Sequence, residues 1–202
     1  DRPSIDFYGR QVELVQALQK TGKPIIAVIV NGKPLNNEWI SDNIPAIVDI
    51  WEPGMYGGQA VAEVLFGKVN PSGKLPITVP KHAGQVPMYY YQASSRYWTG
   101  YGLGSSRSDD KPAYCFGHGL SYTTFEYSDL QVDSVLSSNK DVSISFKVKN
   151  TGKMAGKEVP LVFINDEVSS VVTPAMMLKG FDKIKLEPNE EKLVNIIIPN
   201  EQ

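Results

Sequence analysis

Hydrophobic residues recur with helical spacing in two segments of the first half of the chain. Residues 9–20 place Val12, Val15 and Leu18 on one face, which predicts an amphipathic helix. The Thr-Gly-Lys-Pro run that follows combines glycine with proline, a combination typical of a helix end. Residues 59–66 show a similar spacing and predict a second, shorter helix.

Two apolar runs lie between these helices. Residues 25–30 (IIAVIV) and residues 44–51 (IPAIVDIW) hold at most one charged side chain each. Continuous apolar runs of this length are typical of strands that are covered on both faces of a sheet. Because strands alternate with helices here, the pattern predicts an α/β domain with a largely parallel sheet.

The hydrophobic period changes to two near residue 123. Within residues 141–149 every second residue, beginning with Val142, is apolar, which predicts a strand with one face in a core. Residues 158–164 and 192–198 predict further strands. Short strands separated by turn residues are typical of a β-sandwich.

This change of period predicts two domains. We expect the C-terminal part of an α/β domain over residues 1–122 and an all-β sandwich over residues 123–202. Because a complete sandwich of this kind takes about 100 residues, we expect its last one or two strands to be missing. Residues 67–122 include a long loop rich in Tyr, Ser and Gly, and such loops are usually functional or ordered by a neighbour.

Charge and composition exclude several classes of partner. The 202-residue chain has a formal net charge of −2, and its 20 Lys and Arg residues are scattered, so we expect no nucleic-acid binding. The longest apolar run is too short to cross a bilayer, so we expect no membrane span. Cys115 is the single cysteine and has no Cys/His cluster around it; we interpret it as a half-buried small apolar residue and expect no metal site.

Two motifs could bind a ligand, and each has a structural explanation as well. The glycine-rich residues 54–58 could cradle an anion at a helix start, but a tight turn also accounts for the glycines. The aromatic residues in 88–98 (MYYYQASSRYW) could stack on sugar rings, or they could pack on their own domain. Neither alternative is excluded by the sequence.

Carboxylates are the groups that glycoside hydrolysis requires, because one carboxylate attacks or stabilises the anomeric carbon and another donates a proton. In the α/β region we expect Glu38, Asp42, Asp49 and Glu52 near strand ends. Their spacing does not single out a catalytic pair.

Taken in order, several motifs resemble the C-terminal half of glycoside hydrolase family 3, and the resemblance covers nearly the whole chain. Any one motif is weak, but their order and spacing are specific. The motifs include Asn31-Gly32-Lys33-Pro34-Leu35, Trp51-Glu52-Pro53-Gly54, Asn70-Pro71-Ser72-Gly73-Lys74-Leu75-Pro76, Phe116-Gly117-His118-Gly119-Leu120-Ser121-Tyr122 and Leu178-Lys179-Gly180-Phe181.

The resemblance implies an architecture and an activity. It implies a (β/α)₈-like barrel, an α/β sandwich domain and a fibronectin type III-like domain, of which this chain is too short to hold the barrel. The activity implied is that of a retaining exo-β-glycosidase, most simply a β-glucosidase that removes terminal β-linked glucose. The family's nucleophile is an Asp on the barrel, and its acid/base Glu is expected just upstream of Asp1. We therefore expect no catalytic residue in this chain and no cofactor.

The resemblance also suggests which residues line the sugar pocket. We expect Asp1 and Arg2 beside the acid/base loop. We expect Asn31, Trp51 and Tyr56 near the carboxyl ends of strands, where ligands bind in open α/β sheets.

The aromatic loop supplies the remaining site residues. Tyr91, Arg96 and Trp98 are expected to border the leaving-group subsite. Expected partners are a β-linked glucoside or oligosaccharide and the N-terminal barrel portion of the same protein.

Several alternatives stay open at this point. A β-xylosidase shares the family architecture, and a non-catalytic carbohydrate-binding or interaction module would account for the absence of a catalytic pair. A homodimer is also open. From the family alone, we expect a periplasmic or secreted protein.

Overall fold

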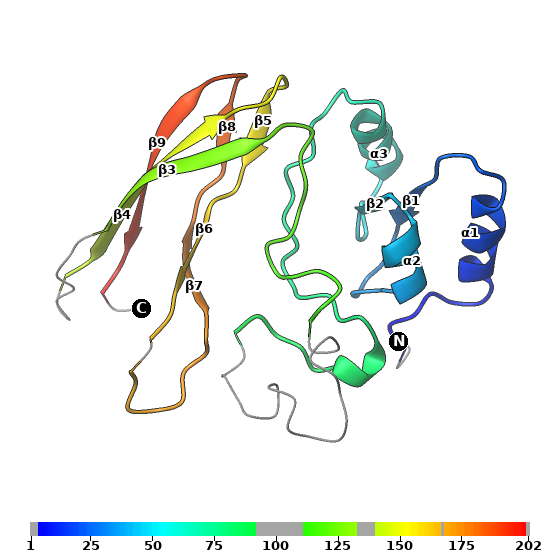
Figure 1. Ribbon diagram of the computed structural model, residues 1–202, viewed down its shortest axis with the longest axis horizontal. Coiled ribbons are helices and arrows are strands. Elements are labelled where there is room, and N and C mark those ends of the chain that lie inside the picture. The colour runs from blue at the N-terminus through cyan, green and yellow to red at the C-terminus, as the bar shows by residue number, and fades with distance from the viewer. Residues whose placement is uncertain (1–3, 92–110, 133–139, 167, 201–202) are drawn as a thin grey trace. The chain divides into compact units, whose positions relative to one another are not determined.

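The computed structural model describes residues 4–91, 111–132, 140–166 and 168–200. The chain divides into two compact units, each built from two segments (Figure 1). The α/β unit consists of Asp1–Glu63 and Leu75–Phe116, and the sandwich unit consists of Val64–Lys74 and Gly117–Gln202. The predicted boundary after residue 122 stays a prediction.

Helices and strands alternate in the first unit, as the hydrophobic pattern predicts. In chain order the elements are α1 (Gln11–Gln19), β1 (Ile26–Ile29), α2 (Glu38–Asn43), β2 (Ala46–Asp49) and α3 (Gly57–Leu65). Strands β1 and β2 pair in parallel, with Ile26 opposite Ala46 and Ile29 opposite Asp49. This arrangement confirms the predicted α/β class with parallel pairing.

The covering of this sheet differs from the prediction. Within the described residues the sheet has two strands, and the side chains of Ile26 and Val28 are 50% and 38% exposed. Helix α1 has no buried residue, and Leu14 on it is 60% exposed. The faces of a sheet are covered by helices packed against it, and in the described residues Ile26 and Val28 of β1 stay exposed, so the predicted covering on both faces is not seen there.

Helix α2 was not predicted. The side chain of Asn37 caps it by accepting a hydrogen bond from the backbone N–H of Ile40 (3.4 Å). As a consequence, Glu38 and Asp42 lie on a helix, and the expectation that they lie near strand ends is wrong. Asp49 is the last residue of β2, so for this carboxylate the expectation is confirmed.

The segment after α3 is held in the α/β unit by buried amides. The side chain of Asn36 donates to the carbonyl of Lys81 (3.1 Å), and Gln85, in the short 3₁₀ helix η1 (Ala83–Gln85), accepts from the Lys81 N–H (2.7 Å). Val79 forms an isolated antiparallel bridge with Tyr114. Cys115, interpreted from the sequence as half-buried, is exposed.

The second unit is all β, as predicted. One sheet has the order β3-β4-β9, while β5 pairs with β8 and β6 pairs with β7, all antiparallel. The strands are β3 (Phe125–Val132), β4 (Val142–Asn150), β5 (Gly156–Glu158), β6 (Leu161–Ile164), β7 (Met177–Phe181), β8 (Ile184–Leu186) and β9 (Glu191–Ile198).

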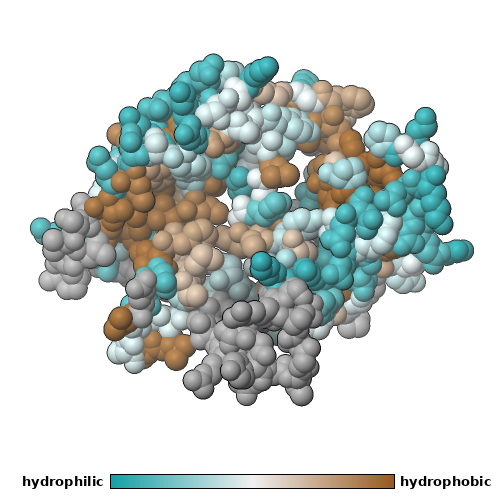
Figure 2. Space-filling view, in the orientation of Figure 1, coloured by the Kyte–Doolittle hydropathy of each residue, from teal (hydrophilic) through white to brown (hydrophobic). Residues whose placement is uncertain are grey.

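Alternation along β4 and β9 builds the core of this unit. Ile144, Phe146 and Val148 of β4 are buried, and they pack with alternate residues of β9 and with the fully buried Leu186. The polar residues between them face the other side of the sheet, so the predicted alternation of residues 141–149 is confirmed. Hydrophobic residues also gather on the visible surface of this unit in Figure 2.

The strand predicted over residues 158–164 is in fact two. Strand β5 ends at Glu158 and β6 begins at Leu161, with Pro160 between them. Proline has no backbone N–H to donate to a ladder, so pairing is interrupted there. The chain exchanges β8 for β7 as its partner across this break.

Candidate functional site

Three residues meet where the parallel strands β1 and β2 end. The backbone N–H of Asn31 donates to the carbonyl of Trp51 (3.3 Å), and the Trp51 N–H donates to Oδ1 of Asp49 (3.2 Å). The Asn31 side-chain amide donates to Oδ2 of the same carboxylate (3.4 Å). The structure therefore brings together two residues of the predicted site, Asn31 and Trp51, and adds Asp49 as the group that joins them.

The backbone after β2 is strained at Trp51, and we call this segment the strained turn. Trp51 has a φ of 51°, in the left-handed region, which costs roughly 1–2 kcal/mol for a residue with a side chain. Asn31 is only 5% exposed, and its buried Oδ1 has no hydrogen-bond partner among the described residues. Strained backbone and unpaired buried polar atoms concentrate at functional sites, so both features support this edge of the sheet as a candidate site.

The glycine-rich residues 54–58 form the tight turn that enters α3. Gly54 has a φ of 67°, and Gly57 lies so close to the ring of Pro53 that a side chain at Gly57 would collide with it. The positive φ of Gly54 and the close approach at Gly57 account for these two glycines without an anion. Tyr56, on the same turn, is 73% exposed and is free to meet a ligand or another part of the protein.

The described part of the aromatic segment forms two ring stacks. Tyr89 and Tyr91 stack with ring centroids 5.4 Å apart, and Tyr90 stacks on Phe116 at 4.2 Å. Tyr90 therefore supports the predicted alternative of packing on its own domain. Tyr91 is half-exposed and remains available for a ligand.

Four predicted site residues cannot be placed. Asp1, Arg2, Arg96 and Trp98 lie outside the described residues. Their expected positions in the sugar pocket stay predictions.

A polar cluster in the sandwich unit was missed by sequence reasoning. Asn150 is fully buried; its Oδ1 accepts from the Thr123 hydroxyl (2.6 Å) and the Gly152 N–H (3.0 Å). Its Nδ2 donates to the carbonyls of Met154 (2.9 Å) and Leu186 (3.2 Å). One sequence signal was available, because residue 150 continues the buried register of β4 with a polar side chain.

A second part of this cluster surrounds Glu158 at the end of β5. Its Oε1 lies 3.4 Å from Nζ of Lys74 and accepts a hydrogen bond from the hydroxyl of Tyr127 (3.1 Å). The side chains of Lys74 and Glu158 are 19% and 11% exposed, so the ion pair is largely removed from water. Burial, followed by the charge and the hydrogen bond of Glu158, raises the pKa of Tyr127 above its ordinary value.

This pKa shift predicts a loss of stability at high pH. Above the ordinary tyrosine pKa of about 10, Tyr127 loses its proton in the unfolded chain but keeps it in the folded chain, so folding becomes less favourable as the pH rises. Urea denaturation measures the stability at about pH 9 and at about pH 11, below and above the ordinary tyrosine pKa. We expect the wild type to lose more stability between the two than Tyr127→Phe, and equal losses would contradict the assignment.

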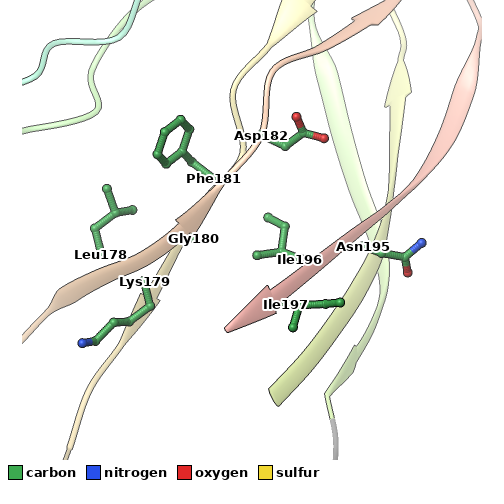
Figure 3. A pocket seen from close by; sticks show the side chains of 8 residues that line it. All are labelled: Leu178, Lys179, Gly180, Phe181, Asp182, Asn195, Ile196 and Ile197. Carbon is green, nitrogen blue, oxygen red and sulfur yellow. The ribbon is translucent and has the colours of Figure 1, made fainter. Parts of the chain in front are cut away.

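An open groove of about 500 Å³ lies in the sandwich unit, which contains none of the predicted site residues. It runs between β7 and β9, where the side chain of Ile196 points toward the backbone of Gly180 (Figure 3). The groove holds no cluster of titratable groups that could act on a sugar, so we do not assign the chemistry to it. Its lining residues are Leu178, Lys179, Gly180, Phe181, Asp182, Asn195, Ile196 and Ile197.

The described residues were predicted to hold neither a metal site nor a membrane span. There, no group of three or more His, Cys, Asp or Glu residues is arranged to hold a metal ion. No helix in that part of the chain is long and apolar enough to cross a bilayer.

The fold defines a class of protein in which an α/β unit, with a strained residue at its strand ends, is followed by an antiparallel β-sandwich. Comparison with known proteins identifies the family. Residues 1–122 match the model of the glycosyl hydrolase family 3 C-terminal domain, and residues 158–202 match the model of a fibronectin type III-like domain. The chain belongs to glycosyl hydrolase family 3, as the sequence motifs predicted.

Several relatives support the same family. A β-xylosidase of Formosa agariphila is 46% identical over 96% of this chain and 27% of its own length. A periplasmic β-glucosidase of Salmonella typhimurium is 41% identical over 98% of this chain and 27% of its own length. The solved structure of a β-glucosidase from Erythrobacter marinus superposes with a TM-score of 0.91 at 41% identity, covering all of this chain and 26% of that one.

These coverages also compare the length of the chain with that of its relatives. It spans about a quarter of the length of the relatives that it matches. The activities of those relatives as whole proteins are therefore proposed for this chain under the next heading.

Proposed function

We propose that this chain is the supporting part of a retaining exo-β-glycosidase, with a β-glucosidase that removes terminal β-linked glucose as the first candidate. The observation that carries this proposal is the match of both family models along the chain, together with relatives named as β-glucosidases and β-xylosidases. The strained turn at Trp51 supports it locally, because it lies at the strand ends where α/β sheets bind ligands.

The two catalytic carboxylates belong, in this proposal, to parts of the protein outside these 202 residues. An aspartate on the barrel attacks the anomeric carbon, and a glutamate upstream of residue 1 protonates the leaving oxygen and then activates water. The residues of this chain bind and orient the sugar. Asn31, Trp51 and Tyr56 form one wall of the pocket, and Asp1 and Arg2 flank the acid/base loop. Tyr91, Arg96 and Trp98 border the leaving-group subsite.

Hydrolysis of two aryl glycosides by the full-length protein tests the activity. We expect release of the aryl group from the β-glucoside with retention of configuration at the anomeric carbon. A full-length protein that hydrolyses neither the β-glucoside nor the β-xyloside would favour the alternative of a non-catalytic carbohydrate-binding module.

A β-xylosidase is the second candidate, and it is favoured by the 46% identity to the Formosa agariphila enzyme. The sugars that the two activities release differ in one substituent, because glucose carries a hydroxymethyl group that xylose lacks. A pocket shaped for xylose collides with that group. The ratio of kcat/KM for the two aryl glycosides therefore decides between the candidates.

Alanine substitutions at Trp51 and Tyr56 test the proposed wall of the pocket. Each aromatic contact with a sugar contributes about 1 kcal/mol, so each change is expected to reduce kcat/KM of the full-length protein about fivefold. Met55→Ala is the matched control, because Met55 is 92% exposed on the same turn and is assigned no role. Wild-type kinetics in both aromatic variants would remove this wall from the proposal.

Three further proposals concern the setting of the protein. The exposed apolar face of β1 is covered by the rest of the protein, which is consistent with a chain spanning a quarter of its relatives. A periplasmic or secreted location is supported by the periplasmic relative of Salmonella typhimurium. A homodimer is a proposal that the mass of the full-length protein in solution tests.

A further inference from the structure

The carboxylate of Asp49 lies between two of the residues that the proposed function places on the wall of the sugar pocket. Asp49 is the last residue of β2, and Asn31 lies just past the end of β1, the parallel neighbour of β2 (Figure 1). Trp51 follows Asp49 by two residues. All three residues belong to the α/β unit, so the contacts among them are internal to one compact unit.

Each oxygen of this carboxylate accepts a hydrogen bond from a different wall residue. Oδ1 accepts from the backbone N–H of Trp51 (3.2 Å), which closes a short turn of the kind that aspartate favours. Oδ2 accepts from the side-chain amide of Asn31 (3.4 Å), at the end of the neighbouring strand. Asp49 therefore joins the backbone of one wall residue to the side chain of the other.

The backbone of Trp51 is also held from its other side. The N–H of Asn31 donates to the carbonyl of Trp51 (3.3 Å), which continues the pairing of the Ile50 N–H with the carbonyl of Ile29 (3.0 Å). Both peptide groups of Trp51 are thus bonded, one to Asp49 and one to Asn31. A residue with a side chain keeps a φ of 51° only where its surroundings hold it there, and these two bonds supply that hold.

The orientation of the Asn31 amide depends on Asp49 as well. An ionised carboxylate can only accept hydrogen bonds, so the amide turns its NH2 group toward Asp49 and its oxygen away. Asn31 is 5% exposed, and its Oδ1 has no partner among the described residues. Within those residues, Asp49 is therefore the group that decides which end of the amide faces which way.

We propose that Asp49 is a positioning residue for the wall of the sugar pocket: its carboxylate holds Trp51 in the left-handed conformation and fixes the direction of the Asn31 amide before the sugar binds. A preformed wall favours binding, because groups that are already in place lose no further freedom when the sugar arrives. This inference rests on the proposed function, in which Asn31 and Trp51 contact the sugar. Asp49 acts through these two residues and does not itself touch the sugar.

A double-mutant cycle in the full-length protein tests whether Asp49 acts through Trp51. Asp49→Ala removes both hydrogen bonds, and we expect it to reduce kcat/KM for the aryl glycoside about fivefold, mainly through a higher KM. In a Trp51→Ala background the same change should cost only about twofold, the share that acts through Asn31. Equal losses in the two backgrounds would overturn the positioning role, since a general defect of folding acts in both.

Asp49→Asn isolates the contact with Asn31 and covers the case in which Asp49→Ala does not fold. Asparagine still offers an oxygen to the Trp51 N–H, but its NH2 group meets the NH2 group of Asn31. We expect kcat/KM to fall about threefold. Adding Asn31→Asp should restore it to within about twofold of the wild type, because donor and acceptor then exchange places across the strand ends. A double variant no better than Asp49→Asn would overturn the hold on Asn31.

Hydrogen exchange of the Trp51 amide reports the turn independently of activity. We expect faster exchange in Asp49→Ala and wild-type exchange in Asp49→Asn, and wild-type exchange in both would overturn the hold on Trp51. Asp42→Asn is the matched control, because Asp42 is exposed on α2 of the same unit. It should leave exchange and kinetics unchanged, and a loss equal to that in Asp49→Asn would reduce the effect to one of charge and overturn the proposal.

Failure of the proposed function is distinguishable from failure of this inference. A wild-type protein that hydrolyses neither aryl glycoside would refute the proposed function and the positioning role together. An active protein with equal losses in the two backgrounds of the cycle would refute the positioning role alone.

Discussion

Replacing Asn150 with alanine is expected to destabilise the sandwich unit by about 3 kcal/mol. The side chain is fully buried and makes four hydrogen bonds, with Thr123, Gly152, Met154 and Leu186. Alanine leaves these donors and acceptors without a partner and without water. Hydrogen exchange of the β4 amides in the full-length protein measures the loss, because it reports the free energy of opening this sheet.

Asn195→Ala is the matched control for this change. Asn195 lies on β9 of the same sheet, but its side chain is exposed. We expect a change within about 0.5 kcal/mol, as for most surface substitutions. Similar losses in the two variants would show that the buried amide network contributes little to the stability of the sandwich.

Replacing Phe146 with alanine is expected to destabilise the same unit by about 4 kcal/mol. Phe146 is 6% exposed and lies in the middle of β4, within the apolar core built with Val194 and Ile196. Removing the ring loses its transfer free energy and leaves a cavity that the paired strands cannot close. The free energy of opening of the β4 amides is again the measurement.

Ile197→Ala provides the comparison for the core substitution. Ile197 is next to a core residue on β9 but is 63% exposed, so its side chain faces the other side of the sheet. We expect a loss of less than about 1 kcal/mol there. A loss at Ile197 as large as that at Phe146 would mean that the exposed face of the sheet is covered in the full-length protein.

The spacing of hydrophobic residues along the chain predicted several of the elements in the described residues. The alternation of residues 141–149 corresponds to β4, and the run of residues 25–30 contains β1. The prediction was wrong where a single residue interrupts a period, as at Pro160, which divides one expected strand into β5 and β6. Helix α2 was missed because its six residues are too few to show a helical period.

The candidate site was only partly predictable. Asn31 and Trp51 could be named because Asn31 follows one apolar run and Trp51 ends the other, and the carboxyl ends of parallel strands lie at one edge of a sheet. The left-handed conformation of Trp51 and the role of Asp49 could not be named, because a hydrogen bond between neighbouring strands leaves no mark in either segment. Lys74 and Glu158 were missed for the same reason.

The sequence by itself determined the order of an α/β part and an all-β part, the alternation that buries β4, and the membership of glycosyl hydrolase family 3. These follow from local period and from motifs in a set order, which are properties of the chain read along its length. Only the tertiary structure decided which polar residues meet: Asn31 with Asp49 and Trp51, and Lys74 with Gly119 and Glu158. Such contacts join residues far apart in the chain, and their geometry depends on strand pairing and packing that no single segment contains.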